Sequence, residues 1–234
     1  MSRLNTVLAS STAAILMAAA WSPAGAAVNC ADLVKLSIPA SEIGLPSGGA
    51  TITSARVATV PADPLNAGAT RDYCQVLGAV APIDPNAPPV NFEVNLPADW
   101  NGKAVQYGGG GSNGVLITGL APLRDARRDT PVPVARGFAT WGTDSGHDNK
   151  KLPHPRAFAL NDEALVNMAY AAYKKTHDVG VRIARAFYDR APAKVYFFGG
   201  SEGGREALMM AQRSRPISTA SSAWCLWPIT PAAI

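Results

Sequence analysis

Residues 199–203 have the pattern G-x-S-x-G, with Ser201 at the centre. The pattern follows the apolar run 195–198 and precedes a helix-like stretch at 205–213. This is typical of a nucleophile elbow, in which a strand enters and a helix leaves a tight turn, and glycines leave room around the exposed serine hydroxyl. The spacing therefore predicts that Ser201 is the nucleophile of a hydrolase.

A general base for Ser201 is harder to find. The chain has three histidines, His147, His154 and His177, and all of them precede the serine. In α/β-hydrolases the order along the chain is serine, acid, histidine, so we interpret Asp144 and His147 as loop residues near the site. His154, between two prolines, is expected in a turn and His177 on a helix surface. A serine without a base is a poor nucleophile, so negligible esterase activity is expected from this polypeptide alone.

Four consecutive glycines, residues 108–111, follow the expected strand 103–107. Backbone N–H groups in such a run can approach a ligand closely, either as a phosphate cradle or as an oxyanion hole. The run lacks the G-K-[ST] ending and the acidic ribose partner of nucleotide sites. We expect an oxyanion hole that uses the N–H of Glu202 and a second N–H from this glycine run. The alternative is a flexible surface loop.

The elements that must position these residues alternate between strands and helices. The patterns predict strands at 50–59, 73–81, 90–96, 103–107, 137–142 and 195–198, and helices at 161–188 and 205–213. Residues 97–102 are interpreted as a hairpin connection, and Gly180 predicts a bend or two shorter helices within 161–188. The order strand, glycine loop, strand, helix, strand, elbow, helix predicts an α/β fold.

The N-terminus has the pattern of an export signal. Arg3 precedes an apolar stretch at 7–21, and residues 24–26 form an A-x-A cleavage site. We therefore expect residues 1–26 to be a signal peptide and the protein to be secreted or periplasmic, without a membrane association after cleavage. A membrane anchor is the alternative, but the stretch is short and interrupted by polar residues.

Export makes the three cysteines interpretable. In an oxidising compartment an odd number implies one pair and one remaining thiol, and we expect Cys30 to pair with Cys74, which leaves Cys225. The alternative is that Cys30 and Cys74 are small buried hydrophobic residues. The chain has no C-x-x-C motif and no histidine-rich tract, so no metal site or cofactor is expected in it.

Composition favours one globular domain. Of 234 residues, 47% are hydrophobic and 16% charged, enough for a substantial core. The net charge of +4 comes from scattered Lys and Arg without a basic block, which argues against a nucleic-acid partner.

Several motifs in order resemble the tannase and feruloyl esterase family of secreted α/β-hydrolases. They are W-N-G at 100–102, the glycine run at 108–111, T-D-S-G-H at 143–147, the long helix, and G-S-E-G-G-R at 200–205. The resemblance spans roughly residues 30–213 and implies the α/β-hydrolase fold. It also implies hydrolysis of phenolic-acid esters, small aromatic molecules, with Ser201 as nucleophile. The same resemblance implies an oxyanion hole formed by the N–H of Glu202 and that of Gly110 or Gly111.

The chain departs from the family in two places. Gly200 stands where many members have a cysteine bridged to one near the catalytic histidine. The family also places its lid, a calcium site in that lid, and the catalytic Asp and His beyond the elbow. Residues 27–213 are therefore expected to form only the N-terminal part of the hydrolase core, without the lid and the C-terminal triad segment.

The tail, residues 214–234, does not have the apolar and acidic sequence that the resemblance predicts after Arg213. One choice of codons for 214–222 encodes the expected peptide in the neighbouring frame, which leads to the hypothesis of a frameshift near codon 213. The alternative is a divergent C-terminus.

Three functions follow from the sequence. The first is an inactive fragment of a secreted phenolic-ester hydrolase, and the second is a non-catalytic secreted binding protein that retains the hydrolase pocket. The third is a nucleotide-binding protein that uses residues 108–111; the missing lysine argues against it.

Overall fold

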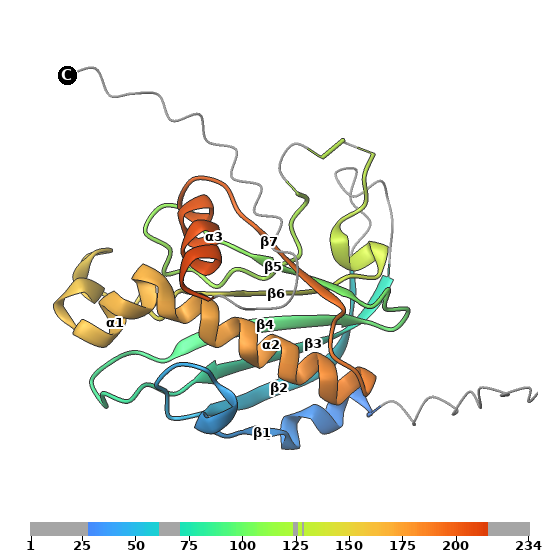
Figure 1. The fold of residues 1–234 in the computed structure, drawn as a ribbon, viewed down its shortest axis with the longest axis horizontal. Helices are drawn as coiled ribbons and strands as arrows, with labels where there is room; N and C mark the ends of the chain where they lie inside the picture. The colour runs from blue at the N-terminus through green and yellow to red at the C-terminus, as the bar shows by residue number, and fades with distance from the viewer. Residues whose placement is uncertain (1–27, 61–70, 124–125, 128, 215–234) are drawn as a thin grey trace, which may run out of the picture.

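The computed structural model describes residues 28–60, 71–123, 126–127 and 129–214 (Figure 1). The expected signal peptide, residues 1–26, and the tail beyond Ser214 lie outside the described residues, as does Cys225. The division of the chain into signal peptide, hydrolase part and atypical tail therefore stays a prediction.

The described residues form one seven-stranded mixed sheet. Its strands are β1 (Ser37–Ile38), β2 (Ala50–Val60), β3 (Arg71–Val80), β4 (Val90–Pro97), β5 (Lys103–Tyr107), β6 (Ala139–Thr143) and β7 (Lys194–Phe198). The order across the sheet is β1-β2-β3-β4-β6-β5-β7. The pairs from β1 to β4 and the pair β4–β6 are antiparallel, whereas β5 pairs in parallel with both β6 and β7. The expected α/β architecture is confirmed.

The order of the central strands differs from the expected hairpin. Residues 97–102 were predicted to connect two paired strands, but β6 lies between β4 and β5, so this prediction is wrong. Trp100 holds the connection elsewhere: its indole N–H donates to the carbonyl of Lys103 at 2.7 Å, and its ring stacks on Tyr188 at the end of α2, with centroids 4.0 Å apart. The connection therefore packs on a helix. It leads to β5 on the far side of β6, which is the strand that pairs with β4.

Three α-helices are described: α1 (Asp162–Val166), α2 (Ala172–Tyr188) and α3 (Glu202–Arg213). The side chain of Asn161 accepts a hydrogen bond from the amide of Ala164 at 2.9 Å and so caps α1. A π-helical segment, Asn167–Ala171, separates α1 from α2. Figure 1 shows α2 lying across the sheet, with α3 above the beginning of α2 and to the left of β7. None of the described helices is both long and apolar enough to cross a membrane.

Gly180 does not break the long helix, which runs through it without interruption as α2. The expected division into two shorter helices at this glycine was wrong, because Gly180 serves close packing instead. A Cβ added to Gly180 would lie 2.6 Å from the ring of Trp141, a fully buried side chain of β6. The missing side chain therefore lets α2 approach the sheet closely.

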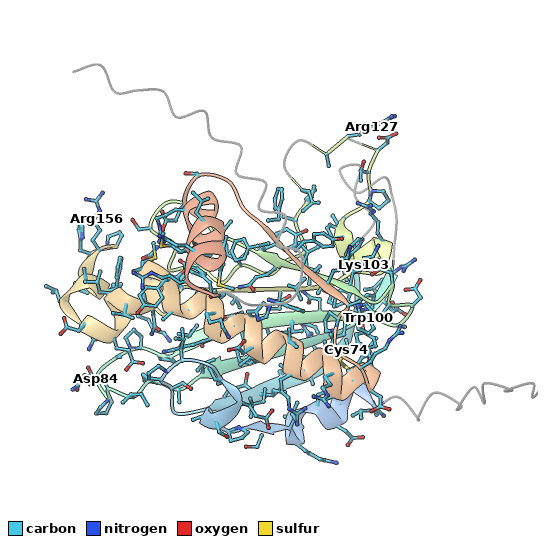
Figure 2. All side chains as sticks on the ribbon, viewed as in Figure 1. Cys74, Asp84, Trp100, Lys103, Arg127 and Arg156 are labelled. Atoms are coloured by element: carbon cyan, nitrogen blue, oxygen red, sulfur yellow. A yellow bond between two sulfur atoms is a disulfide. The ribbon has the colours of Figure 1, made fainter. Side chains whose placement is uncertain are left out.

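A disulfide joins Cys30 to Cys74, the pair expected from the sequence (Figure 2). Cys30 begins the short 3₁₀ helix Cys30–Lys35, and Cys74 lies in β3. Both side chains are buried in the main hydrophobic core, which also contains Trp141. The bridge therefore fixes the start of the described chain to the antiparallel half of the sheet.

We expect loss of this disulfide to lower the free energy of unfolding by about 4 kcal/mol, because the bridge closes a loop with a sequence separation of 44. Urea denaturation of the protein and of a Cys30→Ser, Cys74→Ser variant measures the difference. Thiol labelling of the denatured, unreduced protein should modify one cysteine per chain. Modification of three would contradict the pairing.

Replacing Gly180 by alanine should lower the free energy of unfolding by about 1–3 kcal/mol, since the new methyl group overlaps the Trp141 ring. Helix propensity alone would raise it by about 1 kcal/mol, so the sign of the change is diagnostic. Gly110→Ala is the matched control, because a Cβ there meets nothing within 4 Å. A stabilised Gly180→Ala protein would show that α2 packs less closely.

Candidate active site

Ser201 lies in a sharp turn between β7 and α3, with its backbone at φ 56° and ψ −118°. This conformation is uncommon for a residue with a side chain and typically costs about 1–3 kcal/mol. The flanking glycines permit it, because a Cβ on Gly199 would lie 2.5 Å from the carbonyl oxygen of Gly203. Ser201 itself is exposed. The geometry is that of a nucleophile elbow.

The glycine loop that follows β5 lies directly against this elbow. The amide of Gly108 donates to the carbonyl of Phe198 at 2.8 Å, and the amide of Gly203 donates to the carbonyl of Gly109 at 3.0 Å. A Cβ on Gly203 would lie 2.8 Å from the latter oxygen. The two segments meet because β5 and β7 are parallel neighbours, so their carboxyl ends lie at the same edge of the sheet.

The next two glycines of the loop are open. A Cβ on Gly110 or Gly111 would meet nothing within 4 Å, and both residues are exposed. Within the described part of the chain, no hydrogen bond uses the amide N–H of Gly110, Gly111 or Glu202. The arrangement is compatible with the expected oxyanion hole, which stays a prediction.

The loop after β6 lies beside the glycine loop, since the amide of Gly114 donates to the carbonyl of Asp144 at 3.1 Å. The Asp144 carboxylate accepts hydrogen bonds from the amides of Asn91, at 3.0 Å, and Gly146, at 2.9 Å. Burial raises the pKa of Asp144 to about 6, while these hydrogen bonds oppose the shift. Asp144 thus ties its loop to the start of β4, in agreement with its interpretation as a loop residue.

His147 is 1% exposed and stacks on the ring of Phe158, with centroids 4.2 Å apart. Burial lowers its pKa, and the backbones of Ser112 and Ser145 oppose this shift. Its position in the loop after β6 agrees with the sequence interpretation.

The other two histidines have partners of their own. His154 is exposed in a turn, as predicted, and its Nδ1 accepts from the amide of Arg156 at 3.2 Å. His177 was expected on the surface but is 8% exposed, because it packs edge-on against Trp141. All three histidines of the chain are therefore described, and none hydrogen-bonds to Ser201.

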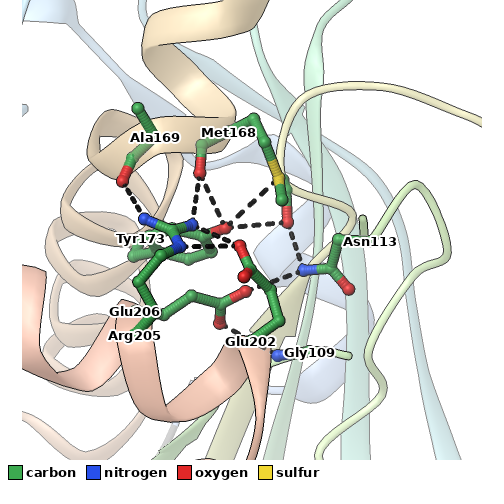
Figure 3. A network of polar contacts seen from close by, with 9 residues as sticks. Gly109, Asn113, Met168, Ala169, Tyr173, Glu202, Arg205 and Glu206 are labelled. Atoms are coloured by element: carbon green, nitrogen blue, oxygen red, sulfur yellow. Dashed lines mark hydrogen bonds and ion pairs between the residues drawn. The ribbon is translucent and has the colours of Figure 1, made fainter. Parts of the chain in front are cut away.

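Arg205 joins the elbow helix to the π-helical segment (Figure 3). Its guanidinium donates to the carbonyls of Met168, at 2.9 Å, and Ala169, at 2.5 Å, and to the carboxylate of Glu202, at 2.8 Å from Nε. The side chain of Glu202 is thereby directed along α3, while its amide N–H stays open. Sequence reasoning missed Arg205, whose partners depend on the irregular helix.

Glu206 is fully buried beneath the glycine loop. One carboxylate oxygen accepts from the amide of Gly109 at 2.9 Å, and the other accepts from the side-chain amide of Asn113 at 3.1 Å. Burial raises the pKa of Glu206 to about 7, against the hydrogen bond from Gly109. Sequence reasoning missed this residue, because a glutamate one turn into a helix ordinarily faces water.

A cavity of about 330 Å³ lies beside α1 and the π-helical segment. Its lining is mainly apolar and includes Leu45, Ile83, Val166 and Tyr170, with Lys175 as a buried cation. The described residues contain no cluster of three or more His, Cys, Asp or Glu side chains that could hold a metal ion. They offer no candidate ligands for the calcium that the family resemblance implies.

A family model described as "Tannase and feruloyl esterase" matches residues 74–215, more than half of the chain. An uncharacterized esterase of Agrobacterium fabrum is 42% identical over 82% of this chain and 34% of its own length. The mono(2-hydroxyethyl) terephthalate hydrolase of Piscinibacter sakaiensis is 33% identical over 72% of this chain and 32% of its own length. The feruloyl esterase B of Aspergillus niger is 28% identical over 79% of this chain and 32% of its own length. The chain spans about a third of the length of these relatives.

Solved structures show the same fold. An esterase from Aspergillus oryzae superposes with a TM-score of 0.54 at 22% identity, over 79% of this chain and 34% of its own. The feruloyl esterase B of the same organism superposes with a TM-score of 0.53 at 24% identity, over 74% of this chain and 35% of its own. The sheet and helices described above therefore match the N-terminal part of α/β-hydrolases of this kind.

We expect Asp144 to make the protein less stable as the pH rises from about 4 to about 6. Its raised pKa means that the folded state holds the proton more tightly than the unfolded state, so its stability contribution is complete below pH 4 and is lost through pH 6. Urea denaturation across this range should show a decrease that is smaller in Asp144→Asn, by up to about 3 kcal/mol. Glu206 titrates in both proteins, so equal pH slopes would contradict the assignment.

Proposed function

The chain belongs to the tannase and feruloyl esterase family, and from this membership we propose that Ser201 is the nucleophile of a carboxylic ester hydrolase. The observation that carries the proposal is the strained, exposed Ser201 in a turn against which the glycine loop is hydrogen-bonded. Such a turn presents a hydroxyl beside unused amide groups, which is the requirement for acyl transfer.

In the proposed reaction the Ser201 hydroxyl attacks the ester carbonyl and passes its proton to a base. The developing oxyanion accepts hydrogen bonds from the N–H of Glu202 and from that of Gly110 or Gly111, each typically worth about 3 kcal/mol. The N-terminus of α3 adds the favourable end of a helix dipole. Collapse of the oxyanion breaks the ester C–O bond, and the alcohol leaves with the proton held by the base. Water then hydrolyses the acyl-enzyme, which releases the acid and restores the Ser201 hydroxyl. The reaction uses no cofactor.

Esters of aromatic acids are the substrate class that we propose. Two relatives are named for ferulate and terephthalate esters, both of which place the ester on an aromatic acid. We also propose that the protein is exported to a secreted or periplasmic location, which the Cys30–Cys74 disulfide supports, because such bonds persist in oxidising compartments.

For these 234 residues alone we propose negligible turnover. The three histidines are engaged in a buried stack, an exposed turn and a helix face, and none is bonded to Ser201. Loss of a triad member typically lowers turnover by about 10⁴-fold. What remains is the oxyanion hole, which by itself still accelerates acylation by about 10³-fold over water.

A non-catalytic binding protein is the second candidate. The cavity of about 330 Å³ beside Tyr170 supports it, since its size and apolar lining suit a small aromatic molecule. Under this alternative, methyl ferulate binds without any reaction at Ser201. Equilibrium dialysis with methyl ferulate and a Tyr170→Ala variant distinguishes a specific site from surface adsorption.

We expect the full chain to hydrolyse methyl ferulate no faster than its Ser201→Ala variant, yet to be acylated slowly by 4-nitrophenyl butyrate, whose leaving group needs no acid catalyst. Mass spectrometry should find one butyryl group on the peptide that contains Ser201, and none in Ser201→Ala. Ser54→Ala, on β2, is the matched control and should be acylated like the parent. Rapid turnover of methyl ferulate would contradict the proposed inactivity, and absence of acylation would refute the nucleophile.

A further inference from the structure

We propose that Glu206 is a positioning residue that holds the glycine loop against the elbow, so that the open amides of Gly110 and Gly111 face the same space as that of Glu202. The inference rests on the proposed function of Ser201. It assigns the alignment of the oxyanion hole to a buried side chain of α3 that touches neither the substrate nor the serine.

The first support is the way in which Glu206 spans the loop (Figure 3). Its two carboxylate oxygens accept from Gly109 and Asn113, which lie on either side of the open residues. Between these anchors the amide of Asn113 donates to the carbonyl of Gly110 at 3.0 Å and closes a turn. One carboxylate therefore fixes both ends of the turn that presents the open amides.

The second support is the tightness of the fit. A Cβ on Gly108 would lie 2.6 Å from a carboxylate oxygen of Glu206, so the loop backbone packs directly on this side chain. Gly110 and Gly111, in contrast, have no neighbour within 4 Å of an added Cβ. The glycine run thus divides into a half that packs on Glu206 and a half that stays open to a ligand.

The third support is that the contact depends on charge. Both groups that face the carboxylate from the loop are donors, so the ionised form satisfies both, whereas a protonated form places a hydrogen opposite one of them. The other titratable groups that act on Glu206 are Tyr173 of α2, and Glu202 and Arg205 of α3. Burial raises the pKa of Glu206 to about 7. The strength of the hydrogen bonds between Glu206 and the glycine loop therefore changes at neutral pH.

The test measures the rate of Ser201 butyrylation by 4-nitrophenyl butyrate in the full chain. Glu206→Gln keeps one acceptor and Glu206→Ala keeps none, so we expect rates lower by about tenfold and about a hundredfold, up to the loss of one oxyanion donor. Glu93→Gln is the matched control: Glu93 is also a buried carboxylate, but it lies in β4 and bonds to Gln75. Its acylation rate should equal that of the parent.

The pH dependence separates positioning from a general loss of structure. The ratio of the parent rate to the Glu206→Gln rate should rise between pH 6 and pH 8, because only the parent has a carboxylate at position 206 that ionises in this range. A purely structural defect would lower the variant rate by the same factor at every pH. In parallel, the ¹H–¹⁵N signals of Gly109 and Gly110 should titrate near pH 7 in the parent and not in Glu206→Gln.

The outcomes distinguish this inference from the proposed function. If Ser201 is acylated and Glu206→Gln reacts like the parent with the same pH profile, the positioning role is overturned while the nucleophile stands. If the parent is not acylated, the proposed function fails and the amide signals decide. If the amide signals of Gly109 and Gly110 shift near pH 7 in the parent but not in Glu206→Gln, the result supports the positioning role of Glu206. If they do not shift in the parent, the positioning role is overturned. Should Glu206→Ala fail to fold, the Glu206→Gln comparison decides.

Discussion

The site depends on the close approach of two backbone segments, the glycine loop after β5 and the turn before α3. Their hydrogen bond, from the amide of Gly203 to the carbonyl of Gly109, forms where no Cβ fits. Parallel pairing of β5 with β7 brings the segments to the same edge of the sheet. The absence of a Cβ on the glycines then lets the two backbones come into contact. The glycines are thus a packing requirement before they are a feature of the chemistry.

This close approach places polar groups in a dry environment, where an unpaired donor or charge is costly. The structure offsets this cost for the buried Glu206 by pairing its carboxylate with the glycine loop, and the partly exposed Arg205 bonds to the carbonyls of Met168 and Ala169. Those carbonyls belong to the π-helical segment, so Arg205 links the first turn of α3 to that irregular segment.

Local patterns in the sequence sufficed for some of this structure. The elbow and the glycine run could be recognised because their geometry is set by glycines within a few residues. The Cys30–Cys74 pair could be recognised because the chain has only three cysteines, which leaves few alternative pairings. The position of β6 between β4 and β5 could not, since pairing depends on contacts far apart in the chain. Glu206 was missed for the same reason: its burial follows from the loop that covers it, which lies 97 residues away.

The difference between contacts within one part of the fold and contacts from distant segments also explains which functional groups the described site contains. The strained serine, the open amides and the helix N-terminus are all held by the sheet edge and by α3, so they form together wherever that edge forms. A general base has no such local constraint, since it needs only to reach the serine hydroxyl from any element that passes nearby. Under the proposed function, the residues described here therefore supply the nucleophile and the oxyanion donors of an acyl-transfer site, and the packing that holds β5, β7 and α3 together fixes both.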